Sequence, residues 1–326
     1  MEYRRLGKQG IQVSEVGLGS WLTYGNAVEG DETKRCLTRA YELGVNFFDT
    51  ANAYAGGESE RAVGAALAGF SRESLVIATK VYFGMGPGPN ERGLSRKHVY
   101  EQCHASLRRL GVDYIDLYQC HRYDDNTPME ETLSVLDNLT RQGKILYYGV
   151  SEWSARQIEE ASKICSDNGF IGLASNQPQY SLMARGIELE TLPTCERLGV
   201  GQVVFSPLAQ GVLTGKYLPG LPPPPDSRAA DPKQNMFLKN GELDAWVQNR
   251  VKIDDTVLSK VQTLKSVAME HDMTLAQMAL AWCLRKPIIS SVIIGASRPQ
   301  QIDDNVKASG IKLSNELINI IEATLA

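Results

Sequence analysis

Three apolar runs in the sequence each stop at a side chain that can take part in catalysis. The first run ends at Asp49 and is followed within one loop by Tyr54. The second run ends at Lys80 and the third at His121. In α/β folds, buried strands stop in this way where their carboxyl ends surround a ligand site. Because neighbouring parallel strands share one rim, we expect the carboxylate, phenol, ammonium and imidazole to converge.

These four groups suit the reduction of a carbonyl group. A phenol with a pKa of about 10 is a poor acid at neutral pH, and an ammonium beside it lowers that pKa, so Lys80 is expected to activate Tyr54. Asp49 would hold Lys80 charged, and a neutral His121 would donate a hydrogen bond to the substrate. Each group alone could be structural, as a cap, an ion pair or a loop aromatic. Their joint placement favours proton donation to a carbonyl, and a cofactor must then supply the hydride.

Strands and helices alternate along most of the chain. The predicted strands are 16–20, 45–49, 75–80, 114–121, 145–151, 173–177, 202–206 and 291–294. The predicted helices between and after them are 31–43, 59–67, 95–110, 129–141, 155–165, 188–198 and 300–308. This pattern predicts an α/β fold, a (β/α)8 TIM barrel, as one domain over residues 1–326. A doubly wound Rossmann sheet is the alternative, but residues 17–22 lack its Gly-x-Gly-x-x-Gly loop.

Four segments depart from the alternation. Residues 3–14 are predicted to form an N-terminal β-hairpin. Residues 207–250 contain Pro222 to Pro225 and are too long for an ordinary connection, so we expect a lid loop after the seventh strand. Two extra helices are predicted at 255–270 and 275–286. A last amphipathic helix at 314–325 is expected to pack across the barrel wall.

Later strands are followed by uncharged polar side chains that can bind a dinucleotide. These are Ser151, Asn176, Gln177 and the run Ser206-Pro207-Leu208-Ala209-Gln210-Gly211. After the eighth strand, Pro299 suits a first helical turn, so a helix N-terminus is expected to face the rim. Arg298 and Lys216 add positive charge there, although Arg298 could be only a solvated residue at the helix start. Positive charge suits a ribose 2′-phosphate, so NADP(H) is the predicted cofactor.

Composition argues against several other classes of protein. The net charge of −4 and the absence of a basic block disfavour nucleic acid as a partner. No apolar run is long enough for a membrane span and the start resembles no signal peptide, so we expect a cytoplasmic protein. The six cysteines have no metal-ligand spacing, and they are expected to be reduced, buried and unbound to metal. Cys120 and His121 are neighbours on a strand and should face opposite ways, which disfavours a Cys-His hydrolase.

At these residues the chain resembles the aldo-keto reductase superfamily over essentially its whole length. Asp49, Tyr54, Lys80 and His121 stand where that family has its catalytic Asp, Tyr, Lys and His. One branch is especially similar, namely the voltage-gated potassium-channel β-subunits and their plant and bacterial relatives. The motifs that carry this similarity are Gly149-Val150-Ser151-Glu152-Trp153-Ser154, Ser206-Pro207-Leu208-Ala209-Gln210-Gly211, Gly215-Lys216-Tyr217 and Ile294-Gly295-Ala296-Ser297.

The resemblance implies NADPH-dependent reduction of aldehydes or ketones with Tyr54 as general acid, and it implies roles for further residues. Trp21, Tyr24, Tyr82 and His121 would border the substrate, and Tyr180 or another rim aromatic would stack on the nicotinamide. Ser151, Asn176 and Gln177 would hold the carboxamide. The remaining implied nucleotide contacts are Gly19, Ser20, Trp21, Asp49, Ser206, Pro207, Leu208, Gln210, Gly211, Lys216, Arg228, Gly295, Ser297, Arg298, Gln301, Asp304 and Asn305.

Two other functions stay open at this stage. The first is a redox-sensing or channel-associated subunit that turns over slowly. The animal β-subunits carry Asn at the position of His121, so His121 favours a working reductase. The expected partner is a small-molecule carbonyl substrate, and a channel partner is not expected. Relatives in this branch are often tetramers or octamers, so a homo-oligomer is an option. The second is a barrel in which Lys80 forms a Schiff base, against which the predicted pairing with Asp49 argues.

Overall fold

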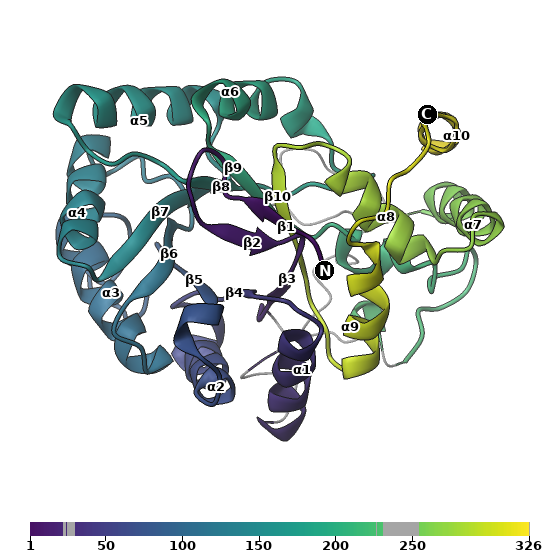
Figure 1. Cartoon of the computed structure of the whole chain (residues 1–326), viewed down its shortest axis with the longest axis horizontal. Helices are drawn as coiled ribbons and strands as arrows, with labels where there is room; N and C mark the ends of the chain where they lie inside the picture. Colours follow the sequence, from purple (N-terminus) through teal and green to yellow (C-terminus); the bar gives the residue numbers. More distant parts are fainter. Residues whose placement is uncertain (22–23, 25–29, 226, 231–253, 326) are drawn as a thin grey trace.

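Eight parallel strands form a closed barrel surrounded by helices (Figure 1). The computed structural model describes residues 1–21, 24, 30–225, 227–230 and 254–325. The barrel order is β10-β3-β4-β5-β6-β7-β8-β9. The strands are β3 (Val16–Gly19), β4 (Phe47–Asp49), β5 (Val76–Val81), β6 (Ile115–Cys120), β7 (Ile145–Ser151), β8 (Ser175–Gln177), β9 (Gly201–Phe205) and β10 (Ile289–Ile294). The predicted TIM barrel is therefore confirmed, and the Rossmann alternative is wrong.

Local sequence signals mark the ends of several helices. In α5, Ser154 and Gln157 form a reciprocal capping box at the start, and Gly169 ends the helix in the left-handed conformation. The helices between the strands are α1 (Gly30–Glu42), α2 (Glu58–Leu67), α3 (Arg96–Leu110), α4 (Met129–Arg141), α5 (Ala155–Asn168), α6 (Thr191–Leu198), α7 (Asp255–Glu270) and α8 (Leu275–Leu284). After β10 come α9 (Pro299–Asn305) and α10 (Asn315–Leu325).

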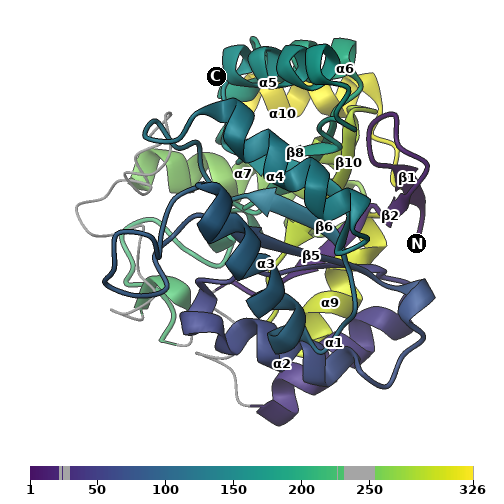
Figure 2. The same cartoon turned by 90° about the vertical axis from the view of Figure 1, so that its left-hand side faces the viewer.

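An N-terminal hairpin closes one end of the barrel. Its strands β1 (Tyr3–Arg5) and β2 (Gln12–Ser14) pair antiparallel, as predicted. Leu6 and Val13 join the apolar cluster inside the barrel, which also contains Phe47 and Val203. Figure 2 shows the hairpin at one end of the barrel and α7 toward the other. With this end filled, the opposite end, where the carboxyl termini of the strands open, is left for a ligand.

A buried carboxylate ties the hairpin to the C-terminal part of the chain. Glu15 is almost fully buried. Its oxygens accept hydrogen bonds from Arg4 Nε at 2.7 Å, from Ser309 Oγ at 2.9 Å and from Gly310 N–H at 2.9 Å. Burial raises the pKa of Glu15, but the Gly310 N–H and the Arg4 charge outweigh it, so the pKa lies below the ordinary 4.5.

The substitution Glu15→Gln is expected to lower the free energy of unfolding at pH 7 by about 2–3 kcal/mol, because the charge-assisted hydrogen bonds to the carboxylate are lost. A carboxyl with a lowered pKa in the folded state stabilises above its unfolded pKa and ceases to do so as the pH falls through the folded value. Urea unfolding at pH 7 and at pH 3 measures both effects. The wild-type and variant stabilities should approach one another at pH 3, and a constant difference would contradict this account.

Several boundaries differ from the sequence prediction. Strand β8 starts at Ser175 rather than at residue 173, and the predicted helix 188–198 starts only at Thr191, after a 3-10 turn at Gly186–Glu188. The predicted helix 300–308 is divided into α9 and the 3-10 turn Val306–Ala308. These short elements lie where tertiary contacts decide the boundary, which local propensity does not report.

The C-terminal helix and the predicted lid need separate comment. Helix α10 packs on α7 and α8, where Glu322 accepts a hydrogen bond from Trp282 Nε1 at 3.2 Å, so it covers outer helices rather than the strands themselves. The described part of the predicted lid contains the 3-10 segments Ala209–Thr214 and Arg228–Ala230. The rest of that prediction, residue 226 and residues 231–250, lies outside the described residues.

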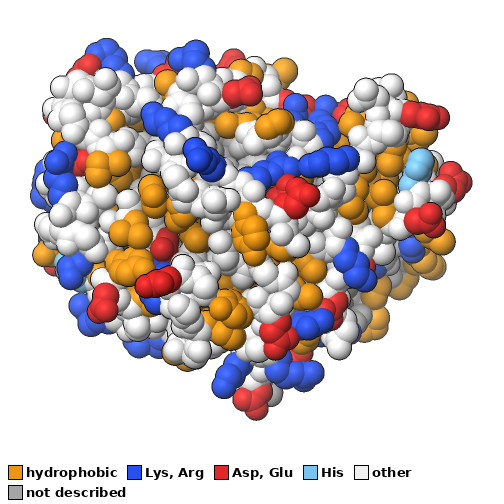
Figure 3. Space-filling view, in the orientation of Figure 1, with side chains coloured by type: hydrophobic (Ala, Val, Ile, Leu, Met, Phe, Trp, Pro, Cys, Tyr) orange, Lys and Arg blue, Asp and Glu red, His pale blue; other side chains and the backbone are white. Residues whose placement is uncertain are grey.

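Charges of both signs are interspersed on the face shown in Figure 3, with hydrophobic side chains between them. None of the described helices is both long and apolar enough to cross a membrane. All six cysteines are buried as free thiols, as predicted. Cys120 lies in the apolar layer between strands and helices while His121 lines the cavity described next, so these two side chains do face opposite ways.

Candidate active site

The four side chains singled out from the sequence meet at the carboxyl ends of β4, β5 and β6. Lys80 Nζ donates to Asp49 Oδ2 at 2.5 Å, to the Thr50 carbonyl at 2.8 Å and to Tyr54 Oη at 3.4 Å. Tyr54 Oη lies 3.5 Å from His121 Nε2. The phenol hydroxyl is therefore flanked by an ammonium on one side and an imidazole on the other, which is the arrangement that the strand ends predicted.

Two amide side chains hold the Asp49 carboxylate from inside the barrel. Its Oδ1 accepts a hydrogen bond from Gln177 Nε2 at 2.9 Å and a longer one from Gln119 Nε2 at 3.4 Å. Oδ2 is left for Lys80. Because both oxygens have partners, the buried carboxylate is fixed in one orientation and in turn fixes the ammonium.

Burial sets the protonation states at the site. It raises the pKa of Tyr54, and the opposing charge of Lys80 does not reverse this, so the predicted net lowering of the Tyr54 pKa is wrong. Burial also lowers the pKa of Lys80, but the adjacent Asp49 outweighs it and the pKa ends above its usual value. For His121, burial and then the charges of Lys80 and Arg122 hold the pKa well below the ordinary value. At pH 7 the site therefore presents a protonated phenol, an ammonium and a neutral imidazole.

This geometry argues against Lys80 as a nucleophile. A Schiff base requires a neutral amine with a free lone pair. All three protons of the Lys80 ammonium are donated, to Asp49, Thr50 and Tyr54. Removing one of them would leave the Asp49 charge buried without its partner. The arrangement suits a fixed positive charge better than a covalent catalyst.

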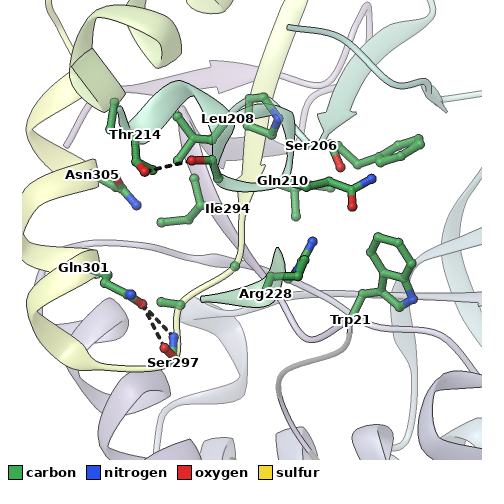
Figure 4. A pocket seen from close by; sticks show the side chains of 18 of the residues that line it. Trp21, Ser206, Leu208, Gln210, Thr214, Arg228, Ile294, Ser297, Gln301 and Asn305 are labelled. Carbon is green, nitrogen blue, oxygen red and sulfur yellow. Dashed lines mark hydrogen bonds between the residues drawn. The ribbon is translucent and has the colours of Figure 1, made fainter. Parts of the chain in front are cut away.

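Asp49, Tyr54 and His121 line a cavity of about 1280 Å³. Lys80 is fully buried and contacts this lining through its hydrogen bonds to Asp49 and Tyr54. Small-ligand pockets are typically about 300–1,000 Å³, so this cavity is large enough for a dinucleotide together with a substrate. Figure 4 shows side chains from β10, from α9 and from the segment that follows β9 pointing into it. The predicted contact residues that line it are Gly19, Trp21, Asp49, Ser151, Gln177, Ser206, Pro207, Leu208, Gln210, Gly211, Lys216, Arg228, Gly295, Ser297, Gln301, Asp304 and Asn305.

Other predicted contact residues lie outside the cavity lining. Tyr24 is buried and donates its hydroxyl to the Ala296 carbonyl at 3.0 Å. Ser20 accepts a hydrogen bond from Ser59 Oγ at 2.7 Å.

Asn176 and Tyr82 also point elsewhere. Asn176 donates to Gln202 Oε1 at 3.3 Å inside the barrel. Tyr82 packs edge-on against Phe83, and it is Phe83 that lines the cavity. Arg298 is exposed at the start of α9 and lies beyond the lining, although its neighbour Ser297 belongs to it.

Tyr180 does not reach the position expected of a nicotinamide-stacking aromatic. It is fully buried, stacks on Trp282 with ring centroids 5.3 Å apart, and donates its hydroxyl to Glu188. The prediction named another rim aromatic as the alternative, and Phe205 at the end of β9 is an aromatic residue that lines the cavity.

Sequence reasoning missed other lining residues. They include Arg122, Gln179, Phe205, Lys265, Met269, Met273 and Thr274. A signal was present for Phe205, because it is the last residue of an apolar run that leads to Ser206. No such signal marked Lys265 and the two methionines, which come from α7 and the turn after it, a part of the chain that follows no barrel strand directly.

The cavity wall between β9 and β10 fits a nucleotide. The buried Oε1 of Gln210 has no hydrogen-bond partner among the described residues, which leaves it available to a ligand amide or hydroxyl. A Cβ atom at Gly19 would lie 2.6 Å from Ile293 Cγ2, so only glycine leaves this part of the floor open. Ser206 and Gln210 have positive φ angles of 52° and 55°, and backbone outliers of this kind cluster at ligand sites.

Cationic side chains line the same wall. The Arg228 guanidinium lies 5.7 Å from the Trp21 ring centroid, and burial lowers its pKa. Lys216 Nζ lies 5.3 Å from the Tyr217 ring centroid. The side chain of Gln301 instead accepts the Ser297 N–H at 2.8 Å, which holds the loop that precedes α9 (Figure 4). Anionic groups of a ligand are thus best placed along this wall, near Arg228 and Lys216.

Comparison with known proteins agrees with the site. The sequence model of the Aldo/keto reductase family matches residues 15–326. A probable voltage-gated potassium channel subunit beta from Arabidopsis thaliana is 46% identical over 311 residues, covering 94% of this chain and 91% of that protein. A protein of the same description from Oryza sativa subsp. japonica is 43% identical over 330 residues, covering 100% of this chain and 97% of its own.

A third relative has a similar description. A putative voltage-gated potassium channel subunit beta from Schizosaccharomyces pombe is 41% identical over 330 residues, covering 99% of this chain and 93% of that protein. The residues matched by the family model include the barrel strands and Asp49, Tyr54, Lys80 and His121. The chain therefore belongs to the aldo/keto reductase family.

Proposed function

We propose that this chain reduces aldehydes and ketones to alcohols with NADPH, and that Tyr54 is the general acid. The observation that carries the proposal is the position of the Tyr54 hydroxyl, 3.4 Å from Lys80 Nζ and 3.5 Å from His121 Nε2, at one end of the large cavity. A substrate carbonyl that reaches this hydroxyl meets a proton donor and two further polar groups. Membership of the aldo/keto reductase family adds support. The alternative in which Lys80 is a nucleophile is disfavoured by the three hydrogen bonds that its ammonium donates.

The residues would divide the reaction as follows. The nicotinamide, when bound, supplies a hydride to the carbonyl carbon. The Tyr54 hydroxyl gives its proton to the carbonyl oxygen, so the C=O double bond becomes a C–O single bond with one new C–H and one new O–H bond. Lys80 stabilises the phenolate that remains, and its ion pair with Asp49 keeps it charged. His121, neutral because it is buried, is placed to orient the carbonyl oxygen by a hydrogen bond.

A preference for NADPH over NADH is expected from the cations at the far end of the cavity. Arg298→Ala should weaken NADPH binding about 10-fold and leave NADH almost unaffected, because a 2′-phosphate loses a charge-assisted hydrogen bond that NADH does not make. Arg228→Ala should weaken the binding of both nucleotides, since its guanidinium lies near the Trp21 ring in the cavity lining and can contact a phosphate that NADPH and NADH share. Fluorescence titrations with each nucleotide measure these affinities, and equal losses in the Arg298 variant would contradict the 2′-phosphate assignment.

The proposal as a whole is tested in two steps. NADPH fluorescence is titrated with protein, and nicotinamide absorbance is then followed after addition of a reactive aryl aldehyde such as 4-nitrobenzaldehyde. Binding followed by aldehyde-dependent loss of absorbance would support the reductase. Absence of nucleotide binding would contradict the reductase and favour a barrel that works without a nucleotide cofactor.

A second function is suggested by what the relatives are called, since all three bear the name of a potassium channel beta subunit. A protein of that kind could hold NADPH and turn over slowly as a redox-sensitive auxiliary subunit. The same experiment separates the two, because this function predicts one fast oxidation per bound nucleotide followed by slow exchange. Sustained turnover favours the reductase.

A further inference from the structure

The cavity contains a positive charge at its substrate end that the reaction proposed above does not use. Arg122 follows His121 directly, is half-buried and lines the cavity. Its Nη1 donates to the His121 carbonyl at 2.6 Å, which holds the start of the side chain in place. Its guanidinium carbon lies 5.7 Å from the centroid of the Phe83 ring, another residue of the lining.

Within the described part of the chain, this guanidinium has no ion-pair partner. Arg122 is absent from the salt bridges of the structure, and the hydrogen bond to His121 uses one of its five N–H groups. The carboxylate that feels its charge is Glu152, which lies too far away for an ion pair and accepts the Gln179 N–H at 2.6 Å instead. A half-buried arginine that faces a cavity with most of its donors unused is suited to an anionic ligand.

The nucleotide phosphates are poorly placed to be that ligand. Arg122 follows β6, whereas Ser297 and Gln301 follow β10. These two strands are four positions apart in either direction around the closed barrel, so they stand on opposite sides of its mouth. The phosphate end already has Arg228 and Lys216 in its lining. The charge on Arg122 therefore belongs to the substrate side.

The wall between Arg122 and the proton donor is continuous and aromatic. The Phe83 and His121 rings meet edge to face with centroids 4.9 Å apart, and the His121 and Tyr54 rings with centroids 5.5 Å apart. A substrate with its carbonyl at Tyr54 could lay a flat apolar body against Phe83. Any anionic group at the far end of that body would then reach the guanidinium.

We propose that Arg122 is a specificity-determining residue that selects carbonyl substrates carrying a carboxylate, with an aromatic or short apolar spacer between the two groups. The fork of the guanidinium matches a planar carboxylate with two parallel hydrogen bonds. The inference rests on the proposed reductase function and names the substrate class of that same site.

The test compares two aldehydes that differ in charge but hardly in shape, 4-carboxybenzaldehyde and its methyl ester, with NADPH as donor. In Arg122→Gln, kcat/KM for the carboxylate divided by that for the ester should fall about 10- to 100-fold relative to wild type, the loss expected for a charge-assisted hydrogen bond. In Arg122→Lys this ratio should fall less, because lysine keeps the positive charge but lacks the two parallel N–H donors of the guanidinium. Arg35→Gln makes the same change on the exposed face of α1, at a side chain 66% exposed, and should leave the ratio unchanged.

A binding measurement separates failure of this inference from failure of the reductase proposal. Calorimetric titration of the alcohol 4-(hydroxymethyl)benzoate, with and without NADP+, requires no turnover. Wild type should bind it at least 10-fold more tightly than Arg122→Gln. If the ester is reduced but neither the kinetic ratio nor this affinity changes in the variant, Arg122 is not an anion subsite although the reductase stands. If neither aldehyde is reduced, the reductase fails, and the calorimetry alone decides whether the carboxylate subsite exists.

Discussion

Tyr54→Phe is expected to lower kcat for aldehyde reduction by about 10³-fold while changing the Kd for NADPH less than about twofold. The variant removes one hydroxyl that lies within reach of Lys80 and His121, and general acid catalysis typically contributes 10²–10⁴-fold. The ring, which also packs edge-on against His121, is kept, so the cavity should retain its shape. Steady-state kinetics with 4-nitrobenzaldehyde and fluorescence titration of NADPH measure the two quantities on one preparation.

A matched control is available in Tyr82→Phe. Tyr82 is the next rim tyrosine along the chain, it packs on Phe83, and it lies outside the cavity lining. Its hydroxyl should contribute little to kcat. Equal losses in the two variants would mean that tyrosine hydroxyls at this rim act on folding rather than on proton transfer, and full activity in Tyr54→Phe would assign the acid to another group.

Lys80→Met is expected to lower kcat by about 10³-fold and also to destabilise the protein by about 3–5 kcal/mol. The activity falls because the phenolate of Tyr54 loses the positive charge that stabilises it, so proton release becomes harder. The stability falls because Asp49, nearly fully buried, is left as an unpaired charge. Kinetics and urea unfolding at pH 7 give the two effects separately.

The double variant Asp49→Asn, Lys80→Met separates the effect on activity from the effect on stability. Replacing both members of a buried ion pair by neutral groups is often close to neutral for stability. We therefore expect most of the free energy of unfolding to return while kcat stays low. Recovery of activity together with stability would show that Lys80 acts only by supporting the fold, which would contradict its role beside Tyr54.

The convergence of the catalytic groups could be predicted because it depends on topology alone. Asp49, Lys80 and His121 end or follow successive strands, and parallel register brings such positions to one rim whatever the packing around them. Which aromatics face the cavity could not be predicted in this way. Tyr180 turns outward to stack on Trp282, a contact between residues about a hundred positions apart that no local pattern encodes.

The direction of the Tyr54 pKa shift also could not be predicted from the sequence. Lys80 beside Tyr54 suggested a lowered phenol pKa, but the net shift is upward because burial outweighs the ammonium. The depth of burial depends on side chains from several strands and loops. A raised pKa still suits the proposed role, since it keeps the phenol protonated until the substrate and hydride donor are in place.

Arg122 was missed for a related reason. On a strand, the neighbour of an inward-facing residue points away from the cavity, as Cys120 does on the other side of His121. Strand β6 ends at Cys120, so this alternation no longer governs Arg122. The Arg122 side chain instead donates a hydrogen bond to the His121 carbonyl and lines the cavity.

In the proposed reaction, hydride from NADPH reaches the carbonyl carbon of a substrate whose oxygen lies at the Tyr54 hydroxyl. The most direct measurement is mass spectrometry of the alcohol formed from 4-nitrobenzaldehyde by wild type and by Tyr54→Phe, with NADPH carrying deuterium on both C4 positions. We predict one deuterium on the carbinol carbon of every product molecule from wild type, and almost no product from the variant. Alcohol without deuterium, or nucleotide that binds and is never oxidised, would contradict the claim.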